Sequence, residues 1–353
     1  MRALTTDLTI DLATNPAINS ATNVTISVTT DPTANMTANV TINPTTYPLL
    51  QLCQGELTMT LAPAIGGAVA SFYSERTANG PRHHWLRPAS AADLAAGSPN
   101  GMACYPMIPF CNRIRDGRFH FSGRRIVLPP NALPSQHPLH GNAWQRPWTV
   151  LSHEADAAQL SLLHERGDWP WRFEATQYVQ LRGEGATLRL MVRNLDSEPM
   201  PLGVGFHPYF PQRAGARLTA QVAAMWHSDS ELLPTSVSVA PVVAQLGAGV
   251  AAADLLLDNN FTGWDGLARI DFAAAADGSP ARALELRADG PLDYLVIYAP
   301  PQGDFMCVEP VSNCTDWFNF PASERASVGG TVLAPGASVE VEMRLLTSWA
   351  GGQ

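Results

Sequence analysis

The chain has 353 residues, of which 46% are hydrophobic and 15% charged, so it can bury a sizeable core in one large domain or two ordinary ones. Its net charge of −9 and isoelectric point near 5.4 argue against a nucleic-acid partner, because no basic stripe is present to meet phosphates. All 22 basic residues are arginine. The absence of lysine excludes a Schiff-base aldolase, a pyridoxal enzyme and a P-loop, since each needs a lysine amine.

The five cysteines are odd in number and lack CxxC spacing, which indicates buried or free thiols in a reducing compartment rather than disulfides or a zinc site. No apolar run reaches the length of a membrane span. The N-terminus lacks the continuous apolar core of a signal peptide. We therefore expect a cytoplasmic protein that does not contact membranes. The sequence leaves its oligomeric state open.

Residues 1–48 differ in composition from the rest of the chain. They are rich in threonine, asparagine and alanine and contain few large side chains, so they can bury little apolar surface. We expect this segment to be a low-complexity, flexible extension whose role the sequence does not indicate. Residues 49–353 show no internal boundary and are expected to form one domain.

The elements after residue 48 are mostly strands. Residues 89–97 ("ASAADLAAG") are a short candidate helix, and residues 117–128 contain two apolar runs around Ser122-Gly123, which indicates a hairpin. Residues 186–194 ("ATLRLMVRN") alternate apolar and polar side chains with a period of two, as half-buried strands do.

The same alternation returns near the C-terminus, in residues 338–346 ("SVEVEMRLL"). Between these strands, residues 242–256 are a doubtful second helix. With 29 prolines and 27 glycines punctuating short strands, the chain is predicted to be all-β, a large antiparallel β-sandwich.

Two ionisable residues each stand before a proline at the end of an apolar run. These are His207 in "GVGFHPYF" and Glu309 in "DFMCVEP". A proline stops ladder pairing, so both side chains are expected at strand ends. Burial raises the pKa of a carboxyl group and lowers that of an imidazole, so the pair can supply an acid and a base near neutral pH. Each residue also has a purely structural explanation. His207 could be a hydrogen-bonded histidine of the core, and Glu309 could form an ion pair with an arginine.

Two further stretches resist a purely structural explanation. Asn112 and Arg113 lie between an apolar strand and the hairpin, in "YPMIPFCNRIRDGRF", although turn chemistry also suits them. His140 ends a long loop in "HPLHGNAW". Because no HxH or HExxH spacing exists, no metal site is predicted. A serine hydrolase and a dinucleotide enzyme lack support, since neither GxSxG nor GxGxxG occurs.

The order of the motifs carries more information than any one of them. The succession "YPMIPFCNRIRDGRF", "LHG", "HPYF", "LDNNFTGWDG" and "CVEP" resembles that of the aldose 1-epimerase (mutarotase) family and covers nearly all of residues 50–346. The resemblance implies a galactose mutarotase-like β-sandwich, or supersandwich, with an open sugar cleft. The chain departs from it at Asn313, where many relatives carry a histidine.

The resemblance also implies roles for the candidate residues. His207 matches the general acid of the family and Glu309 its general base. Arg113 would bind sugar hydroxyls with Asn112 beside it. The two remaining binding residues are His140, near the ring oxygen or the C1 hydroxyl, and Asp258, at the distal hydroxyls.

This chemistry needs no nucleophile, metal or redox cofactor, because opening a hemiacetal only requires one proton taken from the C1 hydroxyl and another given to the ring oxygen. The expected function is therefore a cofactor-independent aldose 1-epimerase acting on a free aldohexose such as galactose or glucose. A hexose-6-phosphate mutarotase remains open, with Arg87, Arg115 or Arg118 as candidate phosphate ligands. A non-catalytic sugar-binding module on the same fold is the other alternative. A glycosidase is disfavoured because it usually needs two flanking carboxylates.

Overall fold

The computed structural model describes residues 4–11, 23–31, 34–43, 47–77, 80–183, 185–211, 214–274, 280–302, 304–321 and 323–350. The segment from residue 47 onward contains two large antiparallel sheets and several small ones. Its buried hydrophobic residues form one cluster that draws on both large sheets, for example Leu190 and Val296. This arrangement confirms the predicted large antiparallel β-sandwich.

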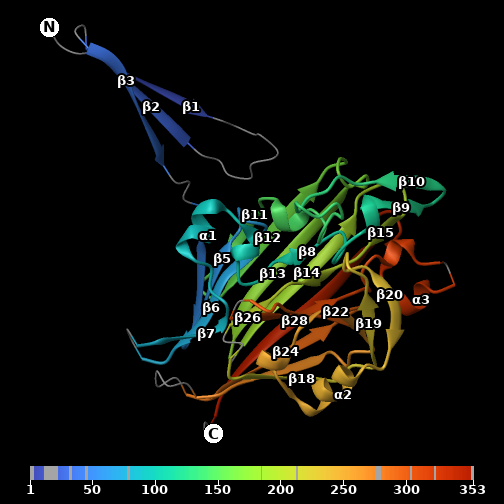
Figure 1. Cartoon of the computed structure of the whole chain (residues 1–353). Coiled ribbons are helices and arrows are strands. Elements are labelled where there is room, and N and C mark those ends of the chain that lie inside the picture. The colour runs from blue at the N-terminus through green and yellow to red at the C-terminus, as the bar shows by residue number, and fades with distance from the viewer. Residues whose placement is uncertain are drawn as a thin grey trace.

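The nine-stranded sheet runs through the middle of the view in Figure 1. Its strands lie in the order β11 (Thr149–His153), β12 (Ala157–His164), β13 (Phe173–Arg182), β14 (Gly185–Asn194), β28 (Ser338–Trp349), β24 (Arg282–Asp289), β23 (Leu267–Phe272), β18 (Ala216–Ala220) and β21 (Val250–Ala251).

The eight-stranded sheet brings together segments from three distant parts of the chain. Its order is β20 (Pro234–Ser238), β19 (Ala224–Ser228), β22 (Leu257–Thr262), β25 (Tyr294–Ala299), β26 (Phe305–Val311), β16 (Gly205–Phe206) and β8 (Pro106–Met107), and β17 (Tyr209–Pro211) also pairs with β26. Strand β26 is thus an inner strand with partners on both flanks.

Smaller elements complete the fold. They are the four-stranded sheet β4 (Leu50–Gln54), β5 (Leu57–Ala62), β6 (Ala68–Glu75) and β7 (Arg82–Leu86), the pairs β9 (Arg118–Phe121) with β10 (Arg124–Val127) and β15 (Met200–Leu202) with β27 (Thr331–Leu333), and the helices α1 (Ala91–Ala96), α2 (Pro241–Ala248) and α3 (Arg325–Val328). No helix among the described residues is both long and apolar enough to cross a bilayer.

The N-terminal segment contains strands that were not expected from its composition. Strands β1 (Leu4–Asp11), β2 (Asn23–Asp31) and β3 (Ala34–Asn43) form an antiparallel sheet of their own, which stands apart from the other sheets in Figure 1. Residues 1–3, 12–22, 32–33 and 44–46 lie outside the described residues. The flexibility of residues 1–48, and the division of the chain at residue 48, stay predictions.

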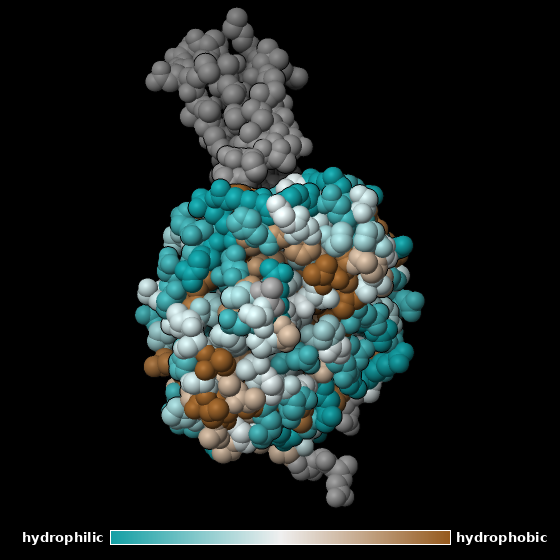
Figure 2. Space-filling model, turned by 90° about the vertical axis from the view of Figure 1, so that its right-hand side faces the viewer, coloured by the Kyte–Doolittle hydropathy of each residue, from teal (hydrophilic) through white to brown (hydrophobic). Residues whose placement is uncertain are grey.

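The alternating segments form strands with the expected faces. In β14, Leu188 and Leu190 are buried while Arg189 between them is exposed. In the predicted hairpin, Phe119 of β9 pairs with Ile126 of β10 around the Ser122-Gly123 turn. Apolar side chains are thereby placed inside, and the face shown in Figure 2 is largely hydrophilic with small apolar patches.

The two candidate helices differ in outcome. Helix α1 begins after Ser90, whose side chain accepts a hydrogen bond from the Asp93 amide in a capping box. The doubtful segment 242–256 is α-helical only as far as Ala248, because Gly249 takes a positive φ of 81° and ends helix α2, and a short 3-10 helix follows at Ala252–Asp254.

Replacing Leu190 with alanine tests the packing between the sheets. Leu190 is fully buried, so the variant should lose about 2–5 kcal/mol of unfolding free energy in urea titrations. Leu163→Ala is the matched control, because Leu163 is 51% exposed and its loss should change the unfolding free energy by no more than about 0.5 kcal/mol. Equal losses from the two variants would contradict this description of the core.

Candidate active site

One cavity of about 430 Å³ is lined by every site residue that the sequence analysis predicted. A volume of this size is in the usual range for small-molecule sites. The expected residues on its wall are Asn112, Arg113, His140, His207, Asp258 and Glu309. The same wall contains residues that were not expected to bind a ligand, among them Tyr105, Tyr209, Leu232, Tyr298 and Phe305.

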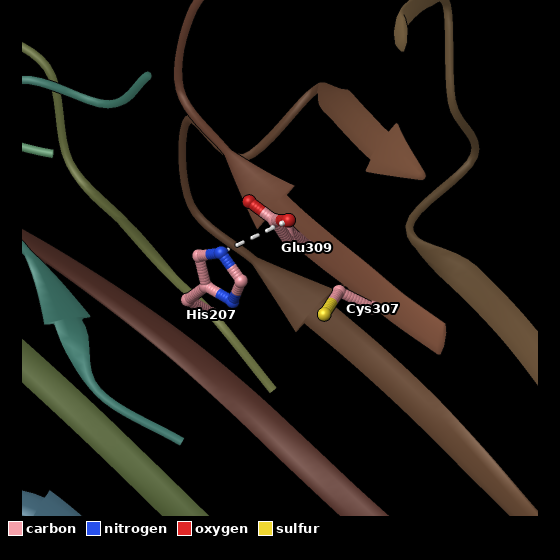
Figure 3. A group of neighbouring side chains, drawn as sticks. All are labelled: His207, Cys307 and Glu309. Carbon is pink, nitrogen blue, oxygen red and sulfur yellow. Dashed lines mark ion pairs between the residues drawn. The ribbon is translucent and has the colours of Figure 1, made fainter. Parts of the chain in front are cut away.

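His207 and Glu309 contact each other, and both are among the buried residues that line the cavity. Nε2 of His207 lies 3.3 Å from Oε1 of Glu309, and the two residues are only 5% and 2% exposed (Figure 3). His207 stands between β16 and β17, where its backbone amide donates a hydrogen bond to the Tyr105 carbonyl at 3.0 Å. The break in pairing that was expected at His207-Pro208 is therefore present.

The expectation of a strand end at Glu309 is wrong. Strand β26 continues through Pro310 to Val311, and β25 pairs with both residues. On its other flank β26 pairs with β17 at Cys307 and next with β16 at Val311. Because pairing on that flank is interrupted between these two points, the strand can include a residue without a backbone N–H. Glu309 thus lies on an inner strand of the sheet, which is held by pairing on both flanks.

Aromatic rings fix the plane of the His207 imidazole. The Tyr209 ring stacks on it with a centroid distance of 4.7 Å and an interplanar angle of 19°. The Tyr105 ring also lies 4.7 Å away, tilted by 32°, and the His140 ring meets it edge-on at 5.0 Å. The imidazole therefore has little freedom to turn away from Glu309. Tyr209 could have been suspected from its place in "HPYF", whereas Tyr105 lies 102 residues before His207.

Burial favours the uncharged form of both members of the pair. Burial, with help from the Arg87 guanidinium, lowers the pKa of the His207 imidazole to about 3. Burial also raises the pKa of Glu309 well above its usual range, and the negative charge of Asp258 adds to this effect while Arg113 opposes it. Both shifts favour the uncharged forms, which are a protonated Glu309 carboxyl group beside a neutral His207 imidazole.

His140 is held by a loop that is tied to the loop of Asn112. The Asn112 amide donates to Nδ1 of His140 at 3.2 Å, and the His140 amide donates to the Asn112 carbonyl at 2.9 Å. Burial lowers the pKa of His140 well below its usual range. With Nδ1 accepting, the neutral ring carries its proton on Nε2. The next residue must be glycine, because Gly141 has a φ of 70° and a Cβ there would lie 1.9 Å from the Ile108 carbonyl oxygen.

Arg113 and Asp258 place opposite charges on the cavity wall. Nη2 of Arg113 lies 3.9 Å from Oδ2 of Asp258, and Nη1 of Arg113 donates to the Asn112 side chain at 3.0 Å. Burial raises the pKa of Asp258, although Arg113 opposes the shift. Together these residues offer both hydrogen-bond donors and acceptors to a ligand.

Arg87 is the second arginine on the cavity wall. Its Cζ lies 4.0 Å from the Tyr209 ring centroid and 4.8 Å from that of Phe305. Nη2 of Arg87 donates to the carbonyls of Asn100 and Met102, at 2.7 and 3.0 Å. The guanidinium is therefore held in one orientation, with a positive charge next to the cavity.

Cys307 completes a cluster of possible metal ligands with the central pair. One ligand atom from each of His207, Cys307 and Glu309 lies within 4.8 Å of the others, and all three residues are buried (Figure 3). The sequence did not predict a metal site here, because two of these residues come from a strand and the third from a distant break between strands. All five cysteines are free thiols, as expected.

The imidazole of His207 should stay neutral as the pH falls from about 8 to about 5, since its lowered pKa of about 3 lies below that range. Histidine-selective NMR checks this: one ring signal, assigned by its loss in His207→Asn, should not shift over that range. A His207 signal that titrates near the usual value of about 6.5 would contradict the burial argument.

Comparisons with known proteins agree with the motif order. The aldose 1-epimerase family profile matches residues 48–346. The uncharacterized protein YphB of Escherichia coli strain K12 is 29% identical over 306 residues, which are 84% of this chain and 98% of that protein.

Two solved structures share the fold. The crystal structure of a putative aldose 1-epimerase from Escherichia coli K12 has a TM-score of 0.75 and 28% identity, covering 86% of this chain and 99% of that one. A galactose mutarotase-like protein from Clostridium acetobutylicum has a TM-score of 0.74 and 22% identity, covering 85% of this chain and 94% of that one.

Proposed function

The chain belongs to the aldose 1-epimerase family, and we propose that it is an isomerase that interconverts the α and β anomers of a free aldohexose such as galactose or glucose without a cofactor. The observation that supports this proposal most is the contact between His207 and Glu309 in a cavity of about 430 Å³. Oxygen atoms of the C1 hydroxyl and of the ring are bonded to the same carbon. The two proton transfers therefore take place close together. An acid and a base only 3.3 Å apart suit them, because one group can reach the C1 hydroxyl while the other reaches the ring oxygen.

The reaction proceeds by ring opening and closure. Glu309 takes the proton of the C1 hydroxyl while His207 gives a proton to the ring oxygen, so the C1–O5 bond breaks and an aldehyde forms. Rotation about C1–C2 turns the other face of the carbonyl toward the C5 hydroxyl. The same two groups, with their roles exchanged, then close the ring to the other anomer.

Sugar binding prepares the pair for this step. We place the shared proton on Glu309 before the sugar binds, because burial disfavours both charged forms. A C1 hydroxyl that donates a hydrogen bond to Glu309 stabilises its carboxylate form. The proton then moves across the 3.3 Å contact to His207, which becomes the acid without a change in the net charge of the cavity.

The other residues hold the sugar. Arg113 donates hydrogen bonds and Asp258 accepts them, which matches hydroxyls that both accept and donate. His140 uses Nδ1 to accept the Asn112 amide, so its Nε2–H faces the ligand as a donor. A donor at this position stabilises the negative charge that develops on an oxygen at C1.

The variants His207→Asn and Glu309→Gln test the pair. Each removes one proton-transfer group, so catalysed mutarotation should fall by about 10²–10⁴-fold, as is usual for the loss of a general acid or base. Polarimetry of freshly dissolved α-D-galactose and α-D-glucose measures this rate. His153→Asn, at an exposed position on β11, is the control and should keep the wild-type rate.

A wild-type rate in His207→Asn would overturn the assignment of the acid. Calorimetry with galactose separates the enzyme from a sugar-binding module: a wild-type protein that binds galactose but does not speed mutarotation is a binding module.

A hexose-6-phosphate mutarotase is the second candidate, because the cavity wall contains Arg87. Of the three arginines considered from the sequence, Arg115 and Arg118 line a separate surface hollow. Arg87 lines the cavity itself, and no carboxylate pairs with it among the described residues. A phosphate group on the sugar would supply the missing negative charge.

Arg87→Met separates the two candidates. If glucose 6-phosphate is the substrate, the variant should lower kcat/KM for that sugar by about tenfold or more, since a hydrogen bond between charged groups contributes about 1.5–3 kcal/mol. Its kcat/KM for glucose should change far less. Arg115→Met, outside the cavity, is the matched control. Failure of the wild-type protein to accelerate glucose 6-phosphate mutarotation would reject the second candidate.

A further inference from the structure

Cys307 has no role in the proposed reaction, yet it adjoins both groups that carry it out. Cys307 and Glu309 are two positions apart on β26, so their side chains project from the same face of the strand. His207 faces them from the break between β16 and β17. Figure 3 shows the His207 ring in contact with the Glu309 carboxylate and the Cys307 thiol beside them, and one ligand atom from each residue lies within 4.8 Å of the others.

We propose that His207, Cys307 and Glu309 form a binding site for a borderline-soft divalent cation such as Zn²⁺, and that an ion bound there blocks mutarotation. Imidazole nitrogen, thiolate sulfur and carboxylate oxygen are the three ligand types that Zn²⁺ takes from proteins. Hard cations such as Mg²⁺ prefer oxygen ligands only, so they should not bind here.

The distances suit one ion. With usual zinc–ligand bonds, two ligand atoms on one tetrahedral zinc lie roughly 3.3–3.6 Å apart. Nε2 of His207 and Oε1 of Glu309 are 3.3 Å apart, which already meets this requirement. No two of the three ligand atoms, one from each residue, are more than 4.8 Å apart, so closing the site requires a movement of roughly 1 Å.

The charges also suit a buried position. Binding replaces the thiol proton of Cys307 and the proton shared by the other two residues, and both protons leave to solvent. The products are a thiolate, a carboxylate and a neutral imidazole around a doubly charged ion, with no net charge. A neutral assembly avoids the large cost of an uncompensated charge in a buried site. The fourth coordination position is left for water or a sugar hydroxyl from the cavity.

An occupied site cannot catalyse the proposed reaction. The ion would bind the lone pair on Nε2 of His207 and the carboxylate of Glu309, which are the two groups that exchange protons with the sugar. Only this second half of the inference rests on the proposed function; metal binding itself rests on the side-chain geometry. The two halves can therefore be tested separately.

The binding test uses the full chain and two metals without sugar. Zn²⁺ should bind with one ion per chain in calorimetry. Cd²⁺ should produce the ultraviolet charge-transfer band of a metal–thiolate bond. Cys307→Ser should abolish the band and weaken Zn²⁺ binding by more than about tenfold. Cys53→Ser, which alters an exposed thiol, should bind like the wild type.

His207→Asn gives a second measurement on the same site, because it removes a ligand and leaves the thiol in place. It should also weaken Zn²⁺ binding by more than about tenfold. Unchanged Zn²⁺ affinity in Cys307→Ser, or a thiolate band that survives this substitution, would overturn the proposed site.

The inhibition test compares mutarotation rates with added metal. Zn²⁺ should slow the wild-type protein in proportion to the occupied fraction, Cys307→Ser should resist, and Mg²⁺ should have no effect. Bound Zn²⁺ without inhibition would overturn the second half of the inference. A wild-type protein that catalyses no mutarotation would refute the proposed function, and the thiolate band would still decide whether the metal site exists.

Discussion

The contact between His207 and Glu309 is the constraint on which the site depends. Two ionisable groups lie 3.3 Å apart and almost fully buried, where a separated charge on either one would be costly. The pKa shifts of both groups reduce this cost, because they favour a neutral imidazole beside a protonated carboxyl group. The proposed opening and closure of a hemiacetal would use such a pair, because a proton can shift from one member to the other.

The two sheets position this pair with little freedom. Glu309 belongs to an inner strand that is paired on both flanks, and His207 lies in the break between β16 and β17 beside it. The stacked ring of Tyr209 and the tilted ring of Tyr105 pack against the imidazole. Rigid placement matters for catalysis because an error of about 1 Å in the position of a reacting group can lower the rate by a factor of about 10².

The sequence predicted those features that depend on local patterns. Alternation of side chains identified β14 and β28 with their correct faces, and the order of the motifs identified six of the residues that line the cavity. It did not predict that β26 continues through Pro310, because this depends on where a strand more than 90 residues earlier stops pairing. The aromatic packing around His207 was also missed, since Tyr105 is distant in the chain.

Cys307 illustrates how a local pattern gains its meaning from the fold. A cysteine two positions before a glutamate shares its face on any strand, but this spacing predicts no metal site without a third ligand. The fold supplies that ligand because the break at His207 lies beside β26. The imidazole of His207 and the carboxylate of Glu309, which suit proton transfer, are also good zinc ligands. With the thiol of Cys307 beside them, the proposed site would bind a soft cation. Serine at this position would remove the soft ligand and leave His207 and Glu309 in place.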